Sequence, residues 1–276
     1  MTSTTTLPQL QQIPHLGAGT FRLKGDDAIK SVTLSLAAGF RHIDTAQIYG
    51  NEVEVGQAIA DSGVARDEIF LTTKVWTDKF SKDLFLDSVQ ESLTKLQTEQ
   101  VDLLLIHWPL QDDSVPMAEY LGELKKAKQQ GLTKHIGVSN FTNAQLKQAI
   151  EILGEGEIFT NQVEVHPYLQ NKNVVDFCQQ NQVLVTAYMP FAYGEVLKDE
   201  TIHSIAQKHQ VSAAQVVLAW ERQMGYVTIP SSTKKANIES NLKASQLTLD
   251  DADLAAIATL DKGHRLANPD FAPQWD

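Results

Sequence analysis

Cysteine is almost absent from this sequence of 276 residues, because Cys178 is the only one, so no internal disulfide can form. Cys178 ends the apolar stretch of residues 174–178, where we expect a packed small hydrophobic side chain rather than a nucleophile. No segment approaches the length of about 18 apolar residues that a membrane-spanning helix needs. Residues 1–12 lack the basic start and apolar run of a secretory signal. We therefore expect a cytoplasmic protein with no membrane partner.

Positive charge is also scarce. Lys and Arg number 23 against 34 Asp and Glu, which leaves a formal charge of -11. Proteins bind nucleic acids mainly by neutralising the phosphate backbone with Lys and Arg, so we expect no nucleic acid partner. A nucleotide cofactor remains compatible with this charge, since one or two local cations and backbone N–H groups can hold a phosphate.

Proline and glycine are few, at 9 and 15 residues, whereas 42% of the chain is hydrophobic. This composition excludes a disordered or collagen-like protein. No linker, repeat or low-complexity tract divides the chain, and α/β barrels of about 250 residues fold as one unit. We therefore expect residues 1–276 to form a single domain.

Short apolar runs alternate with helical patterns along the chain. The predicted strands are residues 16–20, 42–45, 69–75, 101–107, 135–139, 159–165, 183–188 and 226–229. The predicted helices are residues 26–38, 52–62, 82–96, 117–130, 143–153, 174–180, 199–209, 212–224 and 234–242. Repeated strand–helix alternation predicts an α/β protein, a single (β/α)8 TIM barrel, in preference to an open doubly wound sheet. The tail of residues 261–276 is predicted to pack over one face of the barrel.

Chemically active side chains gather where the predicted strands end, which in a barrel is the catalytic face. Asp44 ends the second strand, Lys74 the third and His107 the fourth, and Tyr49 follows Asp44 by five residues. A buried charge is costly unless it is paired. A lysine and an aspartate that end adjacent parallel strands therefore indicate a functional site.

Five segments resemble motifs of the aldo-keto reductases, and they occur in the family's order over nearly the whole chain. They are residues 39–49 (GFRHIDTAQIY), 73–76 (TKVW), 105–109 (LIHWP), 137–141 (GVSNF) and 161–164 (NQVE). The resemblance implies reversible hydride transfer between a nicotinamide cofactor and a carbonyl carbon. It places the family's catalytic positions at Asp44, Tyr49, Lys74 and His107, and it implies that Phe21, Trp76 and Trp108 form the walls of the substrate pocket.

The chemistry of these residue types agrees with such a reaction. Negative charge grows on a carbonyl oxygen as hydride arrives, and Tyr49 is the candidate general acid that neutralises it. Bringing a phenol of pKa about 10 toward neutrality takes roughly 4 kcal/mol, and an ammonium at about 4 Å supplies a similar amount. We therefore expect Lys74 to lower the pKa of Tyr49 while Asp44 holds Lys74 in place. We expect His107 to be a neutral imidazole that donates a hydrogen bond to the carbonyl oxygen.

A G-x-G-x-x-G motif is missing, because residues 17–20 (GAGT) lack the third glycine and the following helix. The barrel face must therefore hold the cofactor. The resemblance implies that Ser139, Asn140 and Gln162 bind the carboxamide and that Tyr188 stacks on the nicotinamide ring. The other expected cofactor-binding residues are Gly19, Thr20, Met189, Phe191, Ser231, Ser232, Lys234 and Asn241.

We expect NADPH rather than NADH. The helix predicted to start near Lys234 offers free N–H groups and a positive dipole end for the extra phosphate. The sequence departs from the common family pattern at two positions, with Ser231 in place of Lys and Asn237 in place of Arg. We expect Lys234 or Lys235 to compensate for the missing cations.

The short loop of residues 109–116 and the small C-terminal segment indicate an open pocket for compact, polar carbonyl compounds. Keto acids, diketo sugar acids and α-ketoaldehydes such as methylglyoxal are the expected small-molecule substrates. Arg265 is a candidate partner for a substrate carboxylate, although a solvated surface arginine is the favoured interpretation. We expect the enzyme to act as a monomer.

Two other functions compete with this hypothesis. A metal-dependent barrel hydrolase is one, because Asp44, His107, Glu164 and His166 are acceptable ligand types at strand ends. It leaves Tyr49 without a task and lacks an H-E-x-x-H pair, so we expect no resident metal. The other is a non-catalytic nucleotide-binding barrel, which the same fold can host. The intact set of four catalytic positions favours an enzyme.

Overall fold

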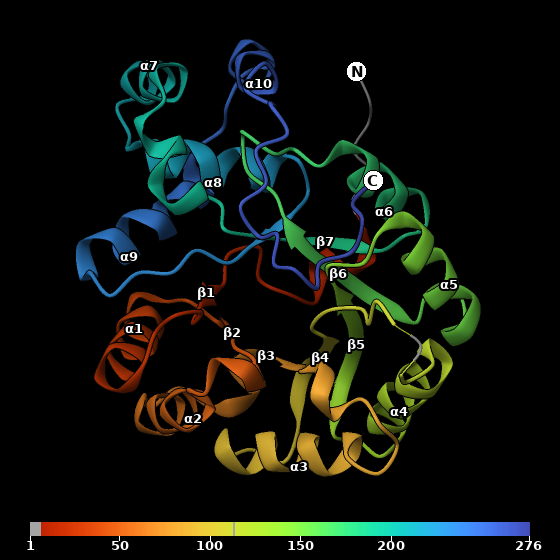
Figure 1. The fold of residues 1–276 in the computed structure, drawn as a ribbon. Coiled ribbons are helices and arrows are strands. Elements are labelled where there is room, and N and C mark those ends of the chain that lie inside the picture. Colours follow the sequence, from red (N-terminus) through yellow and green to blue (C-terminus); the bar gives the residue numbers. More distant parts are fainter. Residues whose placement is uncertain (1–6, 113) are drawn as a thin grey trace.

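The structure is a computed structural model that describes residues 7–112 and 114–276, in which a ring of strands is surrounded by helices (Figure 1). Within these residues, eight parallel strands pair in chain order. They are β1 (Ala18–Gly19), β2 (His42–Asp44), β3 (Phe70–Val75), β4 (Val101–Ile106), β5 (Thr133–Ser139), β6 (Ile158–Glu164), β7 (Leu184–Tyr188) and β8 (Val227–Thr228).

The ring closes between β8 and the segment that precedes β1. Leu16 forms a parallel bridge with Thr228, and the Gly17 N–H donates to the Thr228 carbonyl at 2.8 Å. The predicted (β/α)8 barrel is therefore confirmed, and the alternative of an open doubly wound sheet is wrong.

The helices lie outside the strands. They are α1 (Gly25–Ala38), α2 (Glu52–Asp61), α3 (Phe85–Lys95), α4 (Met117–Gln129), α5 (Asn143–Leu153), α6 (Lys172–Gln180), α7 (Glu200–His209), α8 (Ala213–Gln223), α9 (Lys235–Leu242) and α10 (Asp251–Ala258). Short 3-10 helices add to them: η1 (Pro8–Gln11), η2 (Gln47–Tyr49), η3 (Arg66–Glu68), η4 (Thr77–Lys79), η5 (Ala192–Gly194), η6 (Val196–Lys198) and η7 (Lys243–Gln246). Judged over the described residues, none of the helices combines the length and the hydrophobicity needed to cross a lipid bilayer.

Helix ends follow local sequence signals. Thr142 and Ser212 form capping boxes with Gln145 and Gln215, as their spacing predicts. Gly39 ends α1 with a φ of 113°, a conformation that glycine adopts without steric cost. Helix α10 was not predicted, although Asp250 and Asp253 form a capping box at its start. The capping-box spacing at the start of α10 was therefore a usable sequence signal for this helix.

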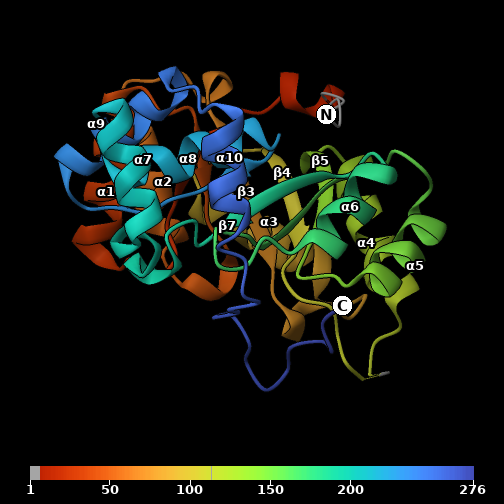
Figure 2. The ribbon, with the colours of Figure 1, turned by 90° about the horizontal axis from the view of Figure 1, so that it is seen from above.

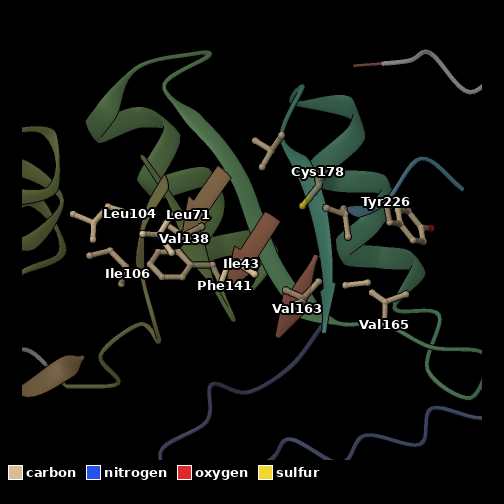
Figure 3. Close-up of a cluster of buried hydrophobic side chains, with 14 of the residues drawn as sticks. Ile43, Leu71, Leu104, Ile106, Val138, Phe141, Val163, Val165, Cys178 and Tyr226 are labelled. Atoms are coloured by element: carbon tan, nitrogen blue, oxygen red, sulfur yellow. The ribbon is translucent and has the colours of Figure 1, made fainter. Parts of the chain in front are cut away.

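The hydrophobic core has two parts. Between the strands and the helices lies a large cluster, in which Ile43, Leu71 and Leu104 are buried (Figure 3). Inside the ring lies a smaller cluster of Leu10, Ile13, Phe70, Leu103, Leu105, Phe159, Leu184 and Val227. Successive side chains of a strand point to opposite faces, so Leu104 of β4 lies in the large cluster and its neighbours Leu103 and Leu105 lie in the smaller one.

The two ends of the barrel differ. η1 lies at one end and the C-terminal residues lie at the other (Figure 2). Leu10 and Ile13 from the N-terminal segment pack into the inner cluster. At the opposite end the C-terminal segment crosses the mouth of the ring (Figure 1), and the Phe271 ring lies 5.7 Å from Trp76 and 5.4 Å from Trp108. The apolar cluster therefore forms a floor beneath the polar strand ends.

Helix α8 carries a carboxyl group in this core. Glu221 is fully buried, and neither of its carboxyl oxygens has a hydrogen-bond partner in the described part of the chain. Burial raises the pKa of Glu221 well above its usual range, and the nearby Thr228 hydroxyl opposes only part of this shift. Burial therefore favours the neutral form of Glu221 in the folded protein.

This buried acid predicts a loss of stability at higher pH. The folded protein holds the Glu221 proton more tightly than the unfolded chain, whose pKa for this group is 4.5. The stabilisation is therefore complete below that pKa and declines by up to about 1.4 kcal/mol per pH unit above it. Glu221→Gln, which does not titrate, should lose less Tm than wild type between about pH 5 and pH 8. A difference of several degrees is expected, since about 1 kcal/mol shifts Tm by about 2–4 °C in a chain of this size.

The measurement is thermal unfolding followed at four pH values. Glu151→Gln removes an exposed carboxyl on α5 and serves as the control, with the pH dependence of wild type. If both variants lose Tm with pH as wild type does, Glu221 is already ionised in the folded protein.

Candidate active site

A buried ion pair forms the centre of the polar end of the barrel. Asp44 ends β2 and Lys74 lies in β3, and their side chains are 1% and 0% exposed. The Lys74 ammonium donates to Asp44 Oδ1 at 2.6 Å and to the Thr45 carbonyl at 2.8 Å. Gln162 Nε2 donates to the second carboxylate oxygen at 2.8 Å. Both oxygens of Asp44 are therefore engaged, and the predicted pair exists.

Tyr49 completes the coordination of Lys74. The ammonium donates to the phenolic oxygen at 3.4 Å, so its three N–H donors reach three acceptors. Tyr49 ends η2, and Gln47 in the same turn accepts from the Trp76 N–H at 3.0 Å. This bond fixes the turn to the end of β3. Because the phenolic oxygen accepts from Lys74, its own O–H remains free to donate elsewhere.

The pKa of Tyr49 differs from the expectation. Burial and the negative charge of Asp44 raise the pKa of Tyr49 well above its usual range. Burial lowers the pKa of Lys74, and Asp44 opposes that change. The expected lowering of the Tyr49 pKa toward neutrality is therefore wrong for this arrangement, because Asp44 offsets the positive charge of Lys74 and burial penalises the phenolate. Tyr49 keeps its proton.

His107 follows β4 and lies beside Tyr49, with 5.5 Å between the ring centroids. Burial, and next the positive charge of Lys74, hold the pKa of His107 well below its usual range, which agrees with the expected neutral imidazole. His107 Nδ1 is buried without a hydrogen-bond partner among the described residues. A buried N–H without a partner is costly. We therefore assign the proton to Nε2.

A cavity of about 1020 Å³ opens above these residues. Asp44, Tyr49 and His107 line it, and Lys74 lies behind them. The aromatic residues expected in the substrate pocket all line the same cavity, namely Phe21, Trp76 and Trp108. So do most of the expected cofactor-binding residues, namely Gly19, Ser139, Asn140, Gln162, Tyr188, Met189, Phe191 and Ser231.

The ends of β5, β6 and β7 carry a connected polar group in this cavity. Asn140 Nδ2 donates to the His107 carbonyl at 3.0 Å, and the Tyr188 hydroxyl donates to Asn140 Oδ1 at 2.8 Å. Ser139 Oγ donates to the Gln162 carbonyl at 2.8 Å. Side-chain amides and hydroxyls beside an aromatic ring suit a planar carboxamide on an aromatic heterocycle. The residues present therefore fit a nicotinamide.

Four expected cofactor-binding residues do not line the cavity. Thr20 is 1% exposed, and its hydroxyl donates to the Asp44 carbonyl at 3.0 Å, so its side chain links the end of β1 to β2. Ser232 Oγ accepts from the Lys234 N–H at 3.1 Å, at the start of α9. Lys234 is exposed and Asn241 is buried within α9. Of the expected cofactor-binding residues between positions 231 and 241, Ser231 is the one that lines the cavity.

Arg265 is half-buried in the tail. Its guanidinium lies 3.8 Å from the Trp275 ring centroid and donates to Asn171 Oδ1 at 3.4 Å. Burial lowers the pKa of Arg265, and Tyr188 and Glu164 lie close enough to oppose that change, although Arg265 is not among the residues that line the cavity. The favoured interpretation of a solvated surface arginine is wrong, because Trp275 covers the guanidinium, whereas a contact with a substrate carboxylate stays a prediction.

Several lining residues were not predicted. They include Arg22, whose guanidinium lies 4.5 Å from the Tyr193 ring centroid, and the apolar side chains of Ile48 and Phe271. Ile48 lies within the motif of residues 39–49 and Arg22 follows the expected pocket residue Phe21, so their positions in the sequence were a usable signal. Phe271 lies in the tail, which contains neither a motif nor a periodic pattern.

The side chains proposed as metal ligands separate into two groups. Asp44 is paired with Lys74, whereas Glu164 Oε1 lies 2.9 Å from His166 Nε2. Among the described residues, nowhere do three or more His, Cys, Asp or Glu side chains gather as a metal-binding group. This geometry does not support the hydrolase hypothesis.

Comparison with known proteins agrees with the site. The sequence profile of the Aldo/keto reductase family matches residues 15–262. The chain is 55% identical to "Methylglyoxal reductase DkgB" of Yersinia pestis, over 96% of this chain and 99% of that protein. It is 39% identical to "Glyoxal reductase" of Bacillus subtilis, over 94% of this chain and 93% of that protein.

A crystal structure described as a candidate 2,5-diketo-D-gluconic acid reductase B is similar, with a TM-score of 0.92 and 42% identity. The match covers 96% of this chain and 94% of that chain. Taken with the family profile and the site, these similarities show that the chain belongs to the aldo/keto reductase family and is an oxidoreductase that reduces carbonyl compounds with a nicotinamide cofactor.

Proposed function

We propose that the chain reduces small aldehydes and ketones with NADPH and that Tyr49 is the general acid. The observation that carries the proposal is the position of the Tyr49 hydroxyl, which accepts from Lys74 at 3.4 Å and lies beside neutral His107 in the cavity. An acid that keeps its proton until the carbonyl oxygen becomes basic suits the reductive direction.

When bound, the nicotinamide cofactor would supply the hydride to the carbonyl carbon. His107 Nε2 donates a hydrogen bond to the carbonyl oxygen and orients it. Tyr49 transfers its proton to the same oxygen, so the C=O double bond becomes a C–OH group, and solvent returns a proton to the phenolate. Lys74 stabilises that phenolate, and Asp44 keeps Lys74 in position through the 2.6 Å contact.

The substrate class that we propose is the α-ketoaldehydes, with methylglyoxal as the first to test. The relatives named methylglyoxal reductase at 52–55% identity support this choice. The aromatic rings of Trp76, Trp108 and Phe271 form one part of the cavity wall, and Arg22 and Lys24 form another. The aromatic part suits a compact substrate without net charge such as methylglyoxal.

Further parts of the proposal concern the state of the protein. We propose that residues 1–276 form a single domain, because the proposed catalytic residues gather at one cavity of one closed barrel, and that the protein acts as a monomer. Residues 261–276 belong to this unit as a wall of the substrate pocket. The formal charge of -11 supports the absence of a nucleic acid partner, and the single buried cysteine supports a cytoplasmic location.

Replacing the proposed acid tests the mechanism. Tyr49→Phe should reduce kcat for methylglyoxal by about 10² to 10⁴-fold, because general acid catalysis typically contributes that much. The NADPH dissociation constant should stay within about twofold, since the hydroxyl contacts Lys74 rather than the residues proposed to hold the cofactor. Steady-state absorbance assays and fluorescence titration measure the two quantities.

Tyr226→Phe is the matched control, because it removes a buried hydroxyl outside the cavity and should leave kcat unchanged. Full turnover by Tyr49→Phe would remove Tyr49 from the mechanism. A wild-type protein that binds NADPH but oxidises it with none of the tested carbonyl compounds would favour the non-catalytic nucleotide-binding barrel.

The pKa directions predict a flat pH profile for the reductive step. Tyr49 stays protonated because its pKa is raised, and His107 stays neutral because its pKa is lowered. Neither group should titrate between about pH 6 and about pH 9. This pH range includes the ordinary pKa of histidine and ends below the ordinary pKa of tyrosine. Single-turnover rates across this range should vary less than about threefold. A decline with a midpoint near pH 8 would show that the phenol becomes acidic in the ternary complex.

The preference for NADPH depends on the start of α9. Lys234 is exposed there, three residues after Ser231, which lines the cavity. Lys234→Ala should raise KM for NADPH by about 10-fold, the size expected for one charge-assisted hydrogen bond, and leave KM for NADH unchanged. Lys147→Ala, an exposed lysine on α5, is the control. A wild-type kcat/KM that favours NADH would overturn the proposed cofactor, and equal losses for both cofactors would move Lys234 away from the 2′-phosphate.

A further inference from the structure

Glu164 is a buried carboxylate at the end of β6 that the catalytic proposal does not use. It is fully buried, and no Lys or Arg of the described residues forms an ion pair with it. Its oxygens instead receive hydrogen bonds from the main chain of the C-terminal segment. The Leu266 N–H donates to Oε1 at 2.9 Å, and the Ala267 N–H donates to Oε2 at 2.8 Å.

His166 completes this arrangement, with Nε2 at 2.9 Å from Glu164 Oε1. Burial raises the pKa of Glu164, but the hydrogen bonds from His166, Ala267 and Leu266 outweigh burial and hold the pKa below its usual range. Glu164 is therefore an anion in the folded protein. Hydrogen bonds to an ionised acceptor are stronger than neutral ones, so Glu164 is a firm anchor for residues 266–267.

The anchored residues lead directly into the wall of the substrate pocket. Leu266, Ala267 and Phe271 all line the cavity. The Phe271 ring meets Trp76 and Trp108 edge to face, with interplanar angles of 88° in both pairs. Phe271 nevertheless remains 45% exposed, so its own burial contributes little to fixing the segment.

The tail has further polar contacts at its two ends. His264 Nε2 lies 2.9 Å from Glu195 Oε2 at the start of the tail, where both side chains are exposed. Asp276 Oδ2 accepts from the Asn143 N–H at 2.8 Å at the start of α5, but this contact is exposed to solvent.

The segment from residue 262 to residue 276 contains neither a helix nor a strand. Ahead of Phe271, the N–H groups of Lys262 and His264 donate to the Tyr168 carbonyl, whereas those of Leu266 and Ala267, nearer to Phe271, both donate to the Glu164 side chain.

We propose that Glu164 is a positioning residue for the substrate pocket: its carboxylate holds the main chain of residues 266–267, and this seats Phe271 against Trp76 and Trp108. The inference rests on the proposed carbonyl reduction and assigns Glu164 no contact with the substrate. It identifies the substrate feature that the wall recognises as an apolar group attached to the carbonyl carbon.

Glu164→Gln tests this role. A glutamine accepts at one atom but presents an N–H donor at the other, so one of the two main-chain N–H groups loses its partner. With phenylglyoxal, an α-ketoaldehyde that carries an aromatic group, KM should rise by about 10-fold while kcat stays within about threefold. The NADPH dissociation constant should be unchanged. Glu157→Gln, which removes a carboxylate that pairs with Lys128 outside the site, should match wild type.

A double-mutant cycle separates positioning from a merely structural role. Phe271→Ala should raise KM for phenylglyoxal, and Glu164→Gln added to it should raise KM no further, because Glu164 acts through Phe271. If the two effects on KM multiply, Glu164 does not act through Phe271 and the inference is wrong.

Amide hydrogen exchange of the wild-type protein tests the anchor without an activity assay and without a variant that has to fold. In the wild-type protein the amides of Leu266 and Ala267 should exchange at least about 10-fold more slowly than those of Asp270 and Phe271. Equal exchange at all four amides would refute the anchor. If the wild-type protein is active and Glu164→Gln has an unchanged KM, this inference alone is wrong. If the wild-type protein has no carbonyl reductase activity, the proposed function is wrong.

Discussion

The buried pair of Lys74 and Asp44 is the constraint on which the site depends. Removing two charges from water is expensive, and the pair is tolerable only if each polar atom finds a partner. Lys74 donates to Asp44, to the Thr45 carbonyl and to Tyr49, and Asp44 accepts from Lys74 and from Gln162. Tyr49 is thus the third acceptor that a buried ammonium needs. Its oxygen is fixed by the requirement to satisfy Lys74, and its proton is left to point away from the pair.

This arrangement also decides which groups carry charge. Asp44 balances Lys74, so neither Tyr49 nor His107 is drawn into an ionised form, and burial keeps both neutral. A carbonyl oxygen in the cavity therefore meets two neutral donors with a cation directly behind one of them. Charge appears only as the reaction proceeds, close to the ammonium that can stabilise it. The site is organised for the charge distribution of the transition state rather than that of the resting enzyme.

The fold and the cluster of proposed catalytic residues could be predicted from the sequence because both follow from local pattern. Parallel strands of a closed barrel place their carboxyl ends on one face, so Asp44, Lys74 and His107 had to meet once the strands were identified. The pKa of Tyr49 could not be predicted, since it depends on the balance between burial and two opposite charges at known distances. Arg265 and Phe271 lie in a segment without periodicity, and their positions follow from tertiary contacts alone. Thr20 shows the same limit, because a residue next to the cavity can turn its side chain into the sheet.

The proposed proton donor, Tyr49, and the proposed pocket wall at Phe271 are held by different parts of the structure. Asp44 and Lys74 belong to strands whose hydrogen bonds to their neighbours fix them over a packed apolar floor. Phe271 belongs to a segment without regular structure that is held through main-chain contacts to β6. A main-chain contact does not depend on the side chains at residues 266–267, so the tail can change in sequence and remain anchored. Substrate preference can therefore vary through residues 268–276 while the geometry around Tyr49 stays the same, because the two share no hydrogen bond.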